Sequence, residues 1–245
     1  MKKTKLKVIG AILGLFISTT GLCACANSQQ SSSSGKTEVK TAEIYKRTEI
    51  ISSSKDAKQL LIDGNKRFVS GKVLAKDITD ARRKELVAKG QHPFVVMVSC
   101  SDSRVPPEVV FDEGVGDLFV VRDAGNVIDP VVLGSIEYGA EHLKAPLIVV
   151  LGHESCGAVK ATVDGGEAPG SIGSIVEDIK PSLEKAKATG ATGASLNEKT
   201  ADENIKASVL AIEKSSVIKK LVEEGKVKVV GAKYHIETGE VVFND

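Results

Sequence analysis

The chain has 245 residues, enough for one sizeable domain and a shorter additional segment. Its formal net charge is +1, with 33 basic and 32 acidic side chains interspersed, which argues against a nucleic-acid-binding surface. Aromatic residues make up 4% of the chain and Trp is absent, which argues against a base-stacking platform or a sugar-binding cleft.

The first 25 residues have the pattern of an export signal. Lysines concentrate before residue 8, and Val8–Ile17 is an apolar run too short to span a bilayer as a permanent helix. Residues 22–25 (LCAC) resemble a bacterial lipoprotein processing box, which implies cleavage before Cys25 and diacylation of its thiol. Two acyl chains anchor a protein stably, so we expect export and attachment to the outer face of the cytoplasmic membrane through this lipid alone. An ordinary secretory peptide, giving a periplasmic or extracellular protein, is the alternative.

A tether and one folded domain are expected after the signal. Residues 26–50 include a run of Ser and Gln that cannot bury a core, as is typical of a flexible linker. Residues 51–245 are expected to form the functional domain.

Helical patterns alternate with strand patterns along this domain. Helices are predicted at 56–70, at 79–89 with Thr79 as the N-cap, at 130–142, and as one long helix marked by apolar residues between 205 and 222. Continuous apolar runs, which suit strands covered on both faces, occupy 94–98, 118–121 and 147–151.

The C-terminal part completes the predicted fold. A fourth strand is expected at 227–230, a hairpin over 234–243 turns at Thr238 and Gly239, and 187–197 is expected to be an exposed loop. The fold class predicted is α/β: a mainly parallel sheet of about four parallel strands plus an antiparallel C-terminal strand, flanked by helices.

Two cysteines, Cys100 and Cys156, belong to the domain rather than to the signal. Outside the cytoplasm two cysteines most often form a disulfide, so their number alone favours that pairing. Their positions favour another role, because Cys100 follows one buried strand while His153 and Cys156 follow another, and ligands gather beyond the carboxyl ends of parallel strands. Cys156 lies near a helix start, where a thiolate is favoured, and Gly157 is expected to allow the tight turn there.

These three side chains, if the strands are neighbours, have the composition of a catalytic zinc site. Two thiolates and one imidazole leave a fourth position open, and soft sulfur disfavours magnesium, calcium or manganese. Asp102 and Arg104 stand beside Cys100 in the sequence and form either a working pair or a structural ion pair.

Residues 100–104 (CSDSR) and 153–158 (HESCGA) resemble the two signature motifs of the β-class carbonic anhydrases. Similar segments extend over roughly residues 55–243, including GDLFVVR at 116–122 and AGN at 124–126. One departure is Asp123, where the family usually has Asn. We expect it to touch no proposed ligand, and therefore to tune the site rather than abolish it.

The resemblance implies reversible hydration of carbon dioxide to bicarbonate and a proton, with one zinc ion per chain on Cys100, His153 and Cys156. It implies that Asp102 orients the attacking oxygen, that Arg104 keeps Asp102 ionised, and that Asp102 becomes a fourth ligand in a closed state of some members. It also implies at least a homodimer.

Two alternatives stay open at this point. The same scaffold with the same ligands hydrolyses carbonyl sulfide or carbon disulfide in some proteins. An exported lipoprotein without catalytic activity, holding zinc passively or closing a Cys100–Cys156 disulfide, is the other.

Overall fold

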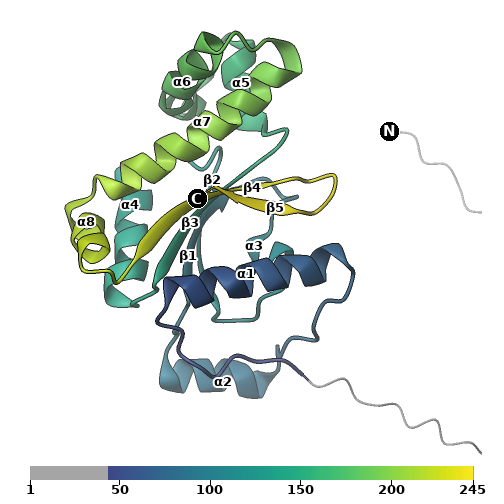
Figure 1. Ribbon diagram of the computed structural model, residues 1–245, viewed down its shortest axis with the longest axis vertical. Coiled ribbons are helices and arrows are strands. Elements are labelled where there is room, and N and C mark those ends of the chain that lie inside the picture. Colours follow the sequence, from purple (N-terminus) through teal and green to yellow (C-terminus); the bar gives the residue numbers. More distant parts are fainter. Residues whose placement is uncertain (1–43, 245) are drawn as a thin grey trace, which may run out of the picture. The chain divides into compact units, whose positions relative to one another are not determined.

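A five-stranded sheet lies at the centre of the structure, a computed structural model in which residues 44–244 are described (Figure 1). The strand order is β2-β1-β3-β4-β5, with bounds β1 Val95–Cys100, β2 Leu118–Asp123, β3 Leu147–His153, β4 Lys228–Tyr234 and β5 Val241–Asn244. The first four strands are parallel, and β5 runs antiparallel to β4. The predicted fold class is confirmed, whereas the signal, Cys25 and the tether up to residue 43 lie outside the described residues.

Helices cover both faces of the sheet. Their bounds are α1 Ser54–Val69, α2 Asp80–Lys89, α3 Pro107–Val110, α4 Pro130–Glu137, the π-helix η1 Tyr138–His142, α5 Gly157–Asp164, α6 Ile172–Ala188, α7 Gly193–Glu213 and α8 Ser216–Glu223. None of these described helices is long and apolar enough to cross a bilayer. Thr79 caps α2 as predicted, since its Oγ1 accepts a hydrogen bond from the Arg82 N–H.

Two apolar layers explain why β1 and β3 are continuous apolar runs. Side chains alternate between the faces of a strand, so Met97 packs in one layer with Leu61 of α1, while Val98 packs in the other with Ile205 of α7. Every residue of β1 and β3 is buried. The two strands that end at the candidate ligands therefore lie in the middle of the core.

Strand β2 differs from this expectation. Its apolar residues are only half-buried, because β2 is an edge strand with β1 as its single neighbour. The prediction that both of its faces are covered is wrong for the single chain. Each end of the sheet therefore presents an edge strand, β2 on one side and β5 on the other.

The segment between β3 and β4 departs most from the sequence prediction. The expected single helix over 205–222 is two helices, because Ser215 ends the run as the N-cap of α8, where its side chain accepts from the Val217 and Ile218 N–H groups. The loop expected over 187–197 is wrong as well. Helix α6 extends to Ala188 and α7 begins at Gly193, so a short connection remains between them.

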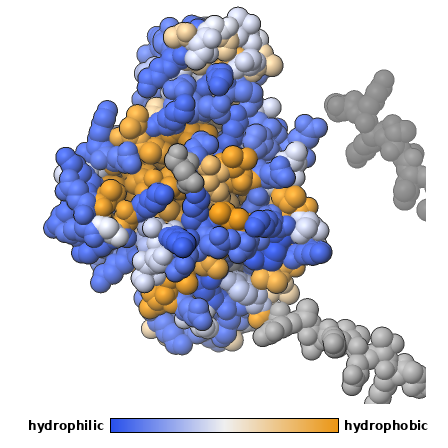
Figure 2. All heavy atoms as spheres, in the orientation of Figure 1, coloured by the Kyte–Doolittle hydropathy of each residue, from blue (hydrophilic) through white to orange (hydrophobic). Residues whose placement is uncertain are grey.

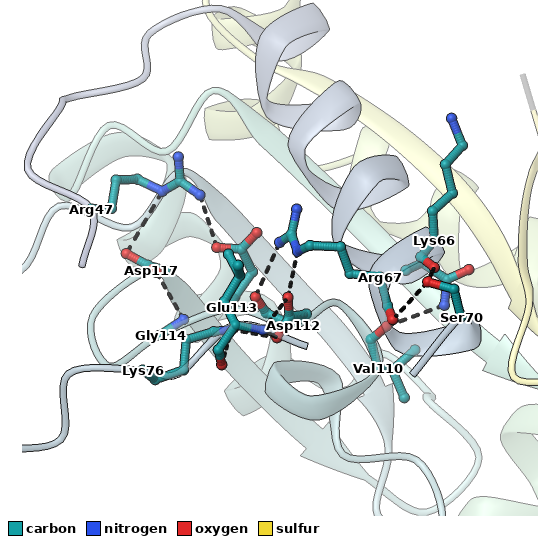
Figure 3. Close-up of polar contacts among 12 residues, drawn as sticks. Arg47, Lys66, Arg67, Ser70, Lys76, Val110, Asp112, Glu113, Gly114 and Asp117 are labelled. Atoms are coloured by element: carbon teal, nitrogen blue, oxygen red, sulfur yellow. Dashed lines mark hydrogen bonds and ion pairs between the residues drawn. The ribbon is translucent and has the colours of Figure 1, made fainter. Parts of the chain in front are cut away.

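Residues 44–50, which the sequence analysis places in the tether, lie against the domain through buried charges. Arg47 donates to Glu113 (2.9 Å) and lies 3.8 Å from Asp117, and Figure 3 shows its guanidinium reaching toward both acids. The guanidinium also stacks over the ring of Phe94, 4.6 Å from its centroid. Beside this pair, Arg67 of α1 contacts Asp112 (Figure 3). The charge cluster ties the start of the described chain to α1 and to the segment before β2.

Candidate metal centre

Three buried donor side chains meet where two neighbouring strands end. Cys100 is the last residue of β1 and His153 is the last residue of β3, and these strands are hydrogen-bonded neighbours. Cys156 follows as the N-cap of α5. The ligand atoms of the three residues all lie within 4.8 Å of one another. The structure thus brings together the three residues that the sequence analysis proposed as ligands.

A strained turn connects His153 to Cys156. Ser155 has a φ of 53°, a left-handed conformation that costs a non-glycine residue about 1 kcal/mol. Its N–H donates to Glu198 Oε1 (3.2 Å), and its carbonyl accepts from Arg104 Nη2 (3.3 Å). Gly157 has no positive φ and has open space at its Cβ position. The prediction that this glycine allows the tight turn is therefore wrong, and Ser155 adopts the left-handed conformation instead.

The chemistry of the donors fits zinc. Cys100 and Cys156 are free thiols, not a disulfide. His153 Nδ1 lies 2.9 Å from the Glu154 carbonyl, which accepts a hydrogen bond from the Nδ1–H group, and this tautomer leaves the Nε2 lone pair for a metal. Nε2 is buried and has no hydrogen-bond partner within residues 44–244, which is rare for a buried polar atom. Two sulfurs and one imidazole nitrogen form a ligand set of catalytic zinc.

The two thiols perturb each other strongly. The pKa of Cys100 is lowered to about 4, first by the hydrogen bond from Cys156 and then, against the effect of burial, by its neighbours His153 and the Gly125 N–H. The pKa of Cys156 is raised, because Cys100 is its hydrogen-bond partner and because both burial and the negative charge of Cys100 disfavour a second thiolate. One thiolate forms readily, and a bound cation favours ionisation of the other.

Asp102 and Arg104 form a two-point ion pair beside the donors. Arg104 Nε donates to Asp102 Oδ1 (3.0 Å) and Nη2 donates to Oδ2 (2.7 Å). Chiefly through these hydrogen bonds, Arg104 lowers the pKa of Asp102 to about 2, so the carboxylate is ionised and only accepts hydrogen bonds at neutral pH. Oδ2 lies 4.0 Å from His153 Nε2. An acceptor oxygen therefore lies next to the donor cluster.

Sequence reasoning missed Arg122 as part of this site. Its Nε donates to the Cys100 carbonyl (3.1 Å) and its Nη2 donates to the Asp102 carbonyl (2.7 Å). The signal was a charged residue that directly follows an apolar strand run, and β2 places it beside Ser99 of β1. Arg122 fixes the backbone that carries both Cys100 and Asp102.

Asp123, the departure from the family pattern, is the last residue of β2, directly before the turn that reaches Cys100. It is the register partner of Cys100, and its Oδ1 accepts the Val127 N–H (2.8 Å). Burial raises the pKa of Asp123 to about 7. Within the same turn, the Gly125 N–H donates to Cys100 Sγ (3.3 Å).

Comparison with known proteins assigns this arrangement to one family. Residues 95–241 match the family model described as carbonic anhydrase. The chain is 44% identical over 186 residues to a carbonic anhydrase of Mycolicibacterium smegmatis, covering 74% of this chain and 88% of that protein. It is 41% identical over 189 residues to carbonic anhydrase 2 of Mycobacterium tuberculosis, covering 76% and 90%.

Solved structures agree with the fold. A tetrameric β-carbonic anhydrase of Sordaria macrospora superposes with a TM-score of 0.63 at 25% identity, covering 67% of this chain and 86% of that one. The Coccomyxa β-carbonic anhydrase in complex with acetazolamide gives 0.60 at 29% identity, covering 67% and 77%. Nothing in these similarities favours the hydrolase or the non-catalytic alternative.

Proposed function

The chain belongs to the β class of the carbonic anhydrases, and we propose that Cys100, His153 and Cys156 hold its zinc ion. The protein is a zinc enzyme that catalyses the reversible hydration of carbon dioxide to bicarbonate and a proton. The observation that carries the assignment of residues is the cluster of donor atoms within 4.8 Å, next to an ionised carboxylate.

Asp102 and Arg104 supply the orientation that the reaction needs. When bound, zinc lowers the pKa of water to about 7, which makes hydroxide available near neutral pH. Asp102 Oδ2 accepts a hydrogen bond from the attacking oxygen and so directs its lone pair at the carbon of the substrate. Arg104 fixes both oxygens of Asp102 and, through the Ser155 carbonyl, links them to the turn that carries His153 and Cys156.

Asp102 is also the candidate for a fourth zinc ligand in a closed state. In the structure both of its carboxylate oxygens accept hydrogen bonds from Arg104. Movement of Asp102 onto the metal therefore requires this two-point contact to break.

Substitutions separate the ligands from the orienting pair. We expect Cys100→Ser, His153→Ala and Cys156→Ser each to lose both zinc and carbon dioxide hydration. Asp102→Ala is expected to retain zinc and to lose activity by about 100-fold, because an oriented acceptor contributes at least this much. Stopped-flow hydration assays with zinc quantification on each purified variant measure both effects. Full turnover by Asp102→Ala removes this residue from its role, and turnover by a zinc-free variant contradicts the metal assignment.

We propose further that the protein is exported and anchored through a lipid on Cys25. The support is the sequence of residues 1–25, with its basic start, short apolar run and lipoprotein-type processing box. In this proposal residues 26 to about 43 form the tether, since Tyr45 and Arg47 already contact the domain. The enzyme then works on the outer face of the bacterial cytoplasmic membrane, or in the periplasm or medium if Cys25 is not lipidated.

We propose that the enzyme is a homodimer or a larger homo-oligomer. The support is the tetrameric Sordaria macrospora relative and the two edge strands of the sheet. Val242 of β5 is 51% exposed and Val69 of α1 is 44% exposed, and Figure 2 shows apolar residues gathered over the face where the β4–β5 hairpin lies. Light scattering on the purified protein measures the mass, and a monomer at micromolar concentration would refute this part of the proposal.

A further inference from the structure

Two buried polar side chains interrupt the apolar face of α7. Asn204 is 3% exposed and Ser208 is 4% exposed, and their spacing places them on the same side of the helix as Ile205 and Ile212. A buried polar group is costly unless it is hydrogen-bonded, so its partners indicate its purpose.

Both side chains bind successive carbonyl groups of one turn. Asn204 Nδ2 donates to the Gly125 carbonyl (2.7 Å), and Ser208 Oγ donates to the Asn126 carbonyl (2.8 Å). Gly125 and Asn126 have φ values of 80° and 44°, both left-handed. Gly and Asn adopt this conformation readily, but the carbonyl groups of these two buried residues need hydrogen-bond partners from outside the turn.

The supported turn contacts a proposed zinc ligand directly. The Gly125 N–H donates to Cys100 Sγ at 3.3 Å. A hydrogen bond from an amide to a thiolate spreads the negative charge of the sulfur and fixes its direction, which are the two effects by which outer groups tune a metal ligand. The position of this N–H depends on the backbone conformation of Gly125.

Helix α7 is itself fixed relative to the sheet. Ile205, which lies between the two polar residues along the helix, packs directly on the backbone of Gly152 in β3 and Gly231 in β4. A Cβ atom at Gly152 or Gly231 would lie 2.4 Å or 2.7 Å from Ile205. Because Gly152 precedes His153, the helix that holds the turn is seated beside a second proposed ligand.

We propose that Asn204 and Ser208 are positioning residues for the metal centre, which hold the Gly125–Asn126 turn so that its N–H points at Cys100 Sγ. The inference rests on the proposed function of Cys100 as a zinc ligand. It adds α7 to the parts of the fold that determine zinc affinity, although α7 supplies no ligand.

The test compares near-isosteric substitutions in the full-length protein. Ser208→Val and Ser208→Thr give side chains of the same shape, of which only Thr keeps the donor hydroxyl, while Asn204→Asp keeps the shape of Asn204 and replaces its donor amide by an acceptor oxygen. Thr200→Val is the matched control, because Thr200 is a buried hydroxyl on the same helix whose bond goes to Leu196 within α7. Chelator competition gives the zinc dissociation constant, and the sulfur-to-metal charge-transfer absorption of the cobalt-substituted protein reports on the thiolates.

We expect Ser208→Val, Asn204→Asp and the double variant to bind zinc about 10-fold to 100-fold more weakly than the parent and to shift the cobalt absorption. Ser208→Thr and Thr200→Val should stay within about two-fold of the parent. Thermal unfolding identifies any variant that fails to fold. If one of the single variants Ser208→Val and Asn204→Asp fails, the zinc affinity of the other one tests the inference. Unchanged zinc affinity and cobalt absorption in the folded donor-deleted variants overturn the inference, as does an equal loss in Thr200→Val. Failure of the proposed function is distinct, since Cys100→Ser would then bind zinc as well as the parent.

Discussion

Glu113 combines an ion pair with complete burial. Its side chain is 0% exposed and Arg47 donates to it at 2.9 Å, yet its Oε1 is buried without a hydrogen-bond partner among the described residues. Burial raises the pKa of Glu113 to about 7, more than Arg47 lowers it. The pKa of Arg47 is itself raised by the same pair, against the effect of burial. Burial dominates at Glu113, because a carboxylate with only one oxygen hydrogen-bonded is costly inside a protein.

A pH dependence of stability follows at this residue. The folded pKa of Glu113 lies above its ordinary value of 4.5, so the folded state holds the proton more tightly than the unfolded chain. Its contribution to the free energy of unfolding is present below pH 4.5 and is lost as pH rises toward 7. Glu113→Gln, which is neutral throughout, should therefore gain stability relative to the parent by at most about 3 kcal/mol between pH 4.5 and pH 8.

Urea unfolding of parent and variant at both pH values measures this difference. Other titrating groups cancel between the two proteins, and Glu108→Gln, at an exposed position on α3, serves as the control. A difference between parent and Glu113→Gln that does not change with pH would show that Arg47 compensates the buried charge fully.

At the scale of elements, the contact between α7 and the sheet depends on glycines in the strands, which leave room for Ile205. Ile205 occupies the space above Gly231 that a Cβ would need. We expect Gly231→Ala to destabilise the fold by about 1–3 kcal/mol, the usual cost of overpacking. Gly134→Ala in α4 is the matched control: nothing lies within 4 Å of its Cβ position, and replacing a helical glycine is worth about 0.5–1 kcal/mol. Chemical denaturation should move the two midpoints in opposite directions, and equal midpoints would contradict the packing argument.

The sequence predicted an element well where a local pattern of a few neighbouring residues determines it. The apolar runs of β1 and β3 and the cap at Thr79 depend on local pattern, and both are found where predicted. The break at Ser215 was missed because the apolar spacing continues across it, while the capping hydrogen bonds are visible only in the structure. The start of α7 was mistaken for a loop because Gly, Ala and Thr suggested exposure; Gly193 and the two residues after it are exposed, as expected, but helical.

The residues of the site likewise include some that the sequence predicted and some that it did not. Cys100, His153 and Cys156 are separated in sequence, but parallel strand ends made their convergence predictable. Asn204 and Ser208 were not predicted, because their contacts join α7 to a turn far away in the chain. Polar residues at helical spacing within a buried stripe were the available signal.

At the scale of the whole molecule, the proposed export would place a metal site with two thiols in an oxidising compartment. The Cys100 and Cys156 sulfurs lie within 4.8 Å of each other and are free, whereas bonded disulfide sulfurs are about 2 Å apart. Zinc bound by the proposed ligands would keep both as thiolates and so protect them from pairing. Loss of zinc leaves two neighbouring thiols that can pass two electrons and two protons to dissolved oxygen and form a disulfide.

We therefore expect metal removal to be reversible only under reducing conditions. In protein lacking residues 1–25, Cys100 and Cys156 are the remaining cysteines, so thiol titration reports on this pair alone. After chelation in air, zinc without reductant should restore little carbon dioxide hydration, and about two thiols per chain should have disappeared. The same sample kept anaerobic, or treated with reductant before zinc, should regain activity. Full recovery in air with both thiols intact would show that the end of β1 and the start of α5 hold the sulfurs too far apart to pair, and that zinc is not needed to keep them reduced.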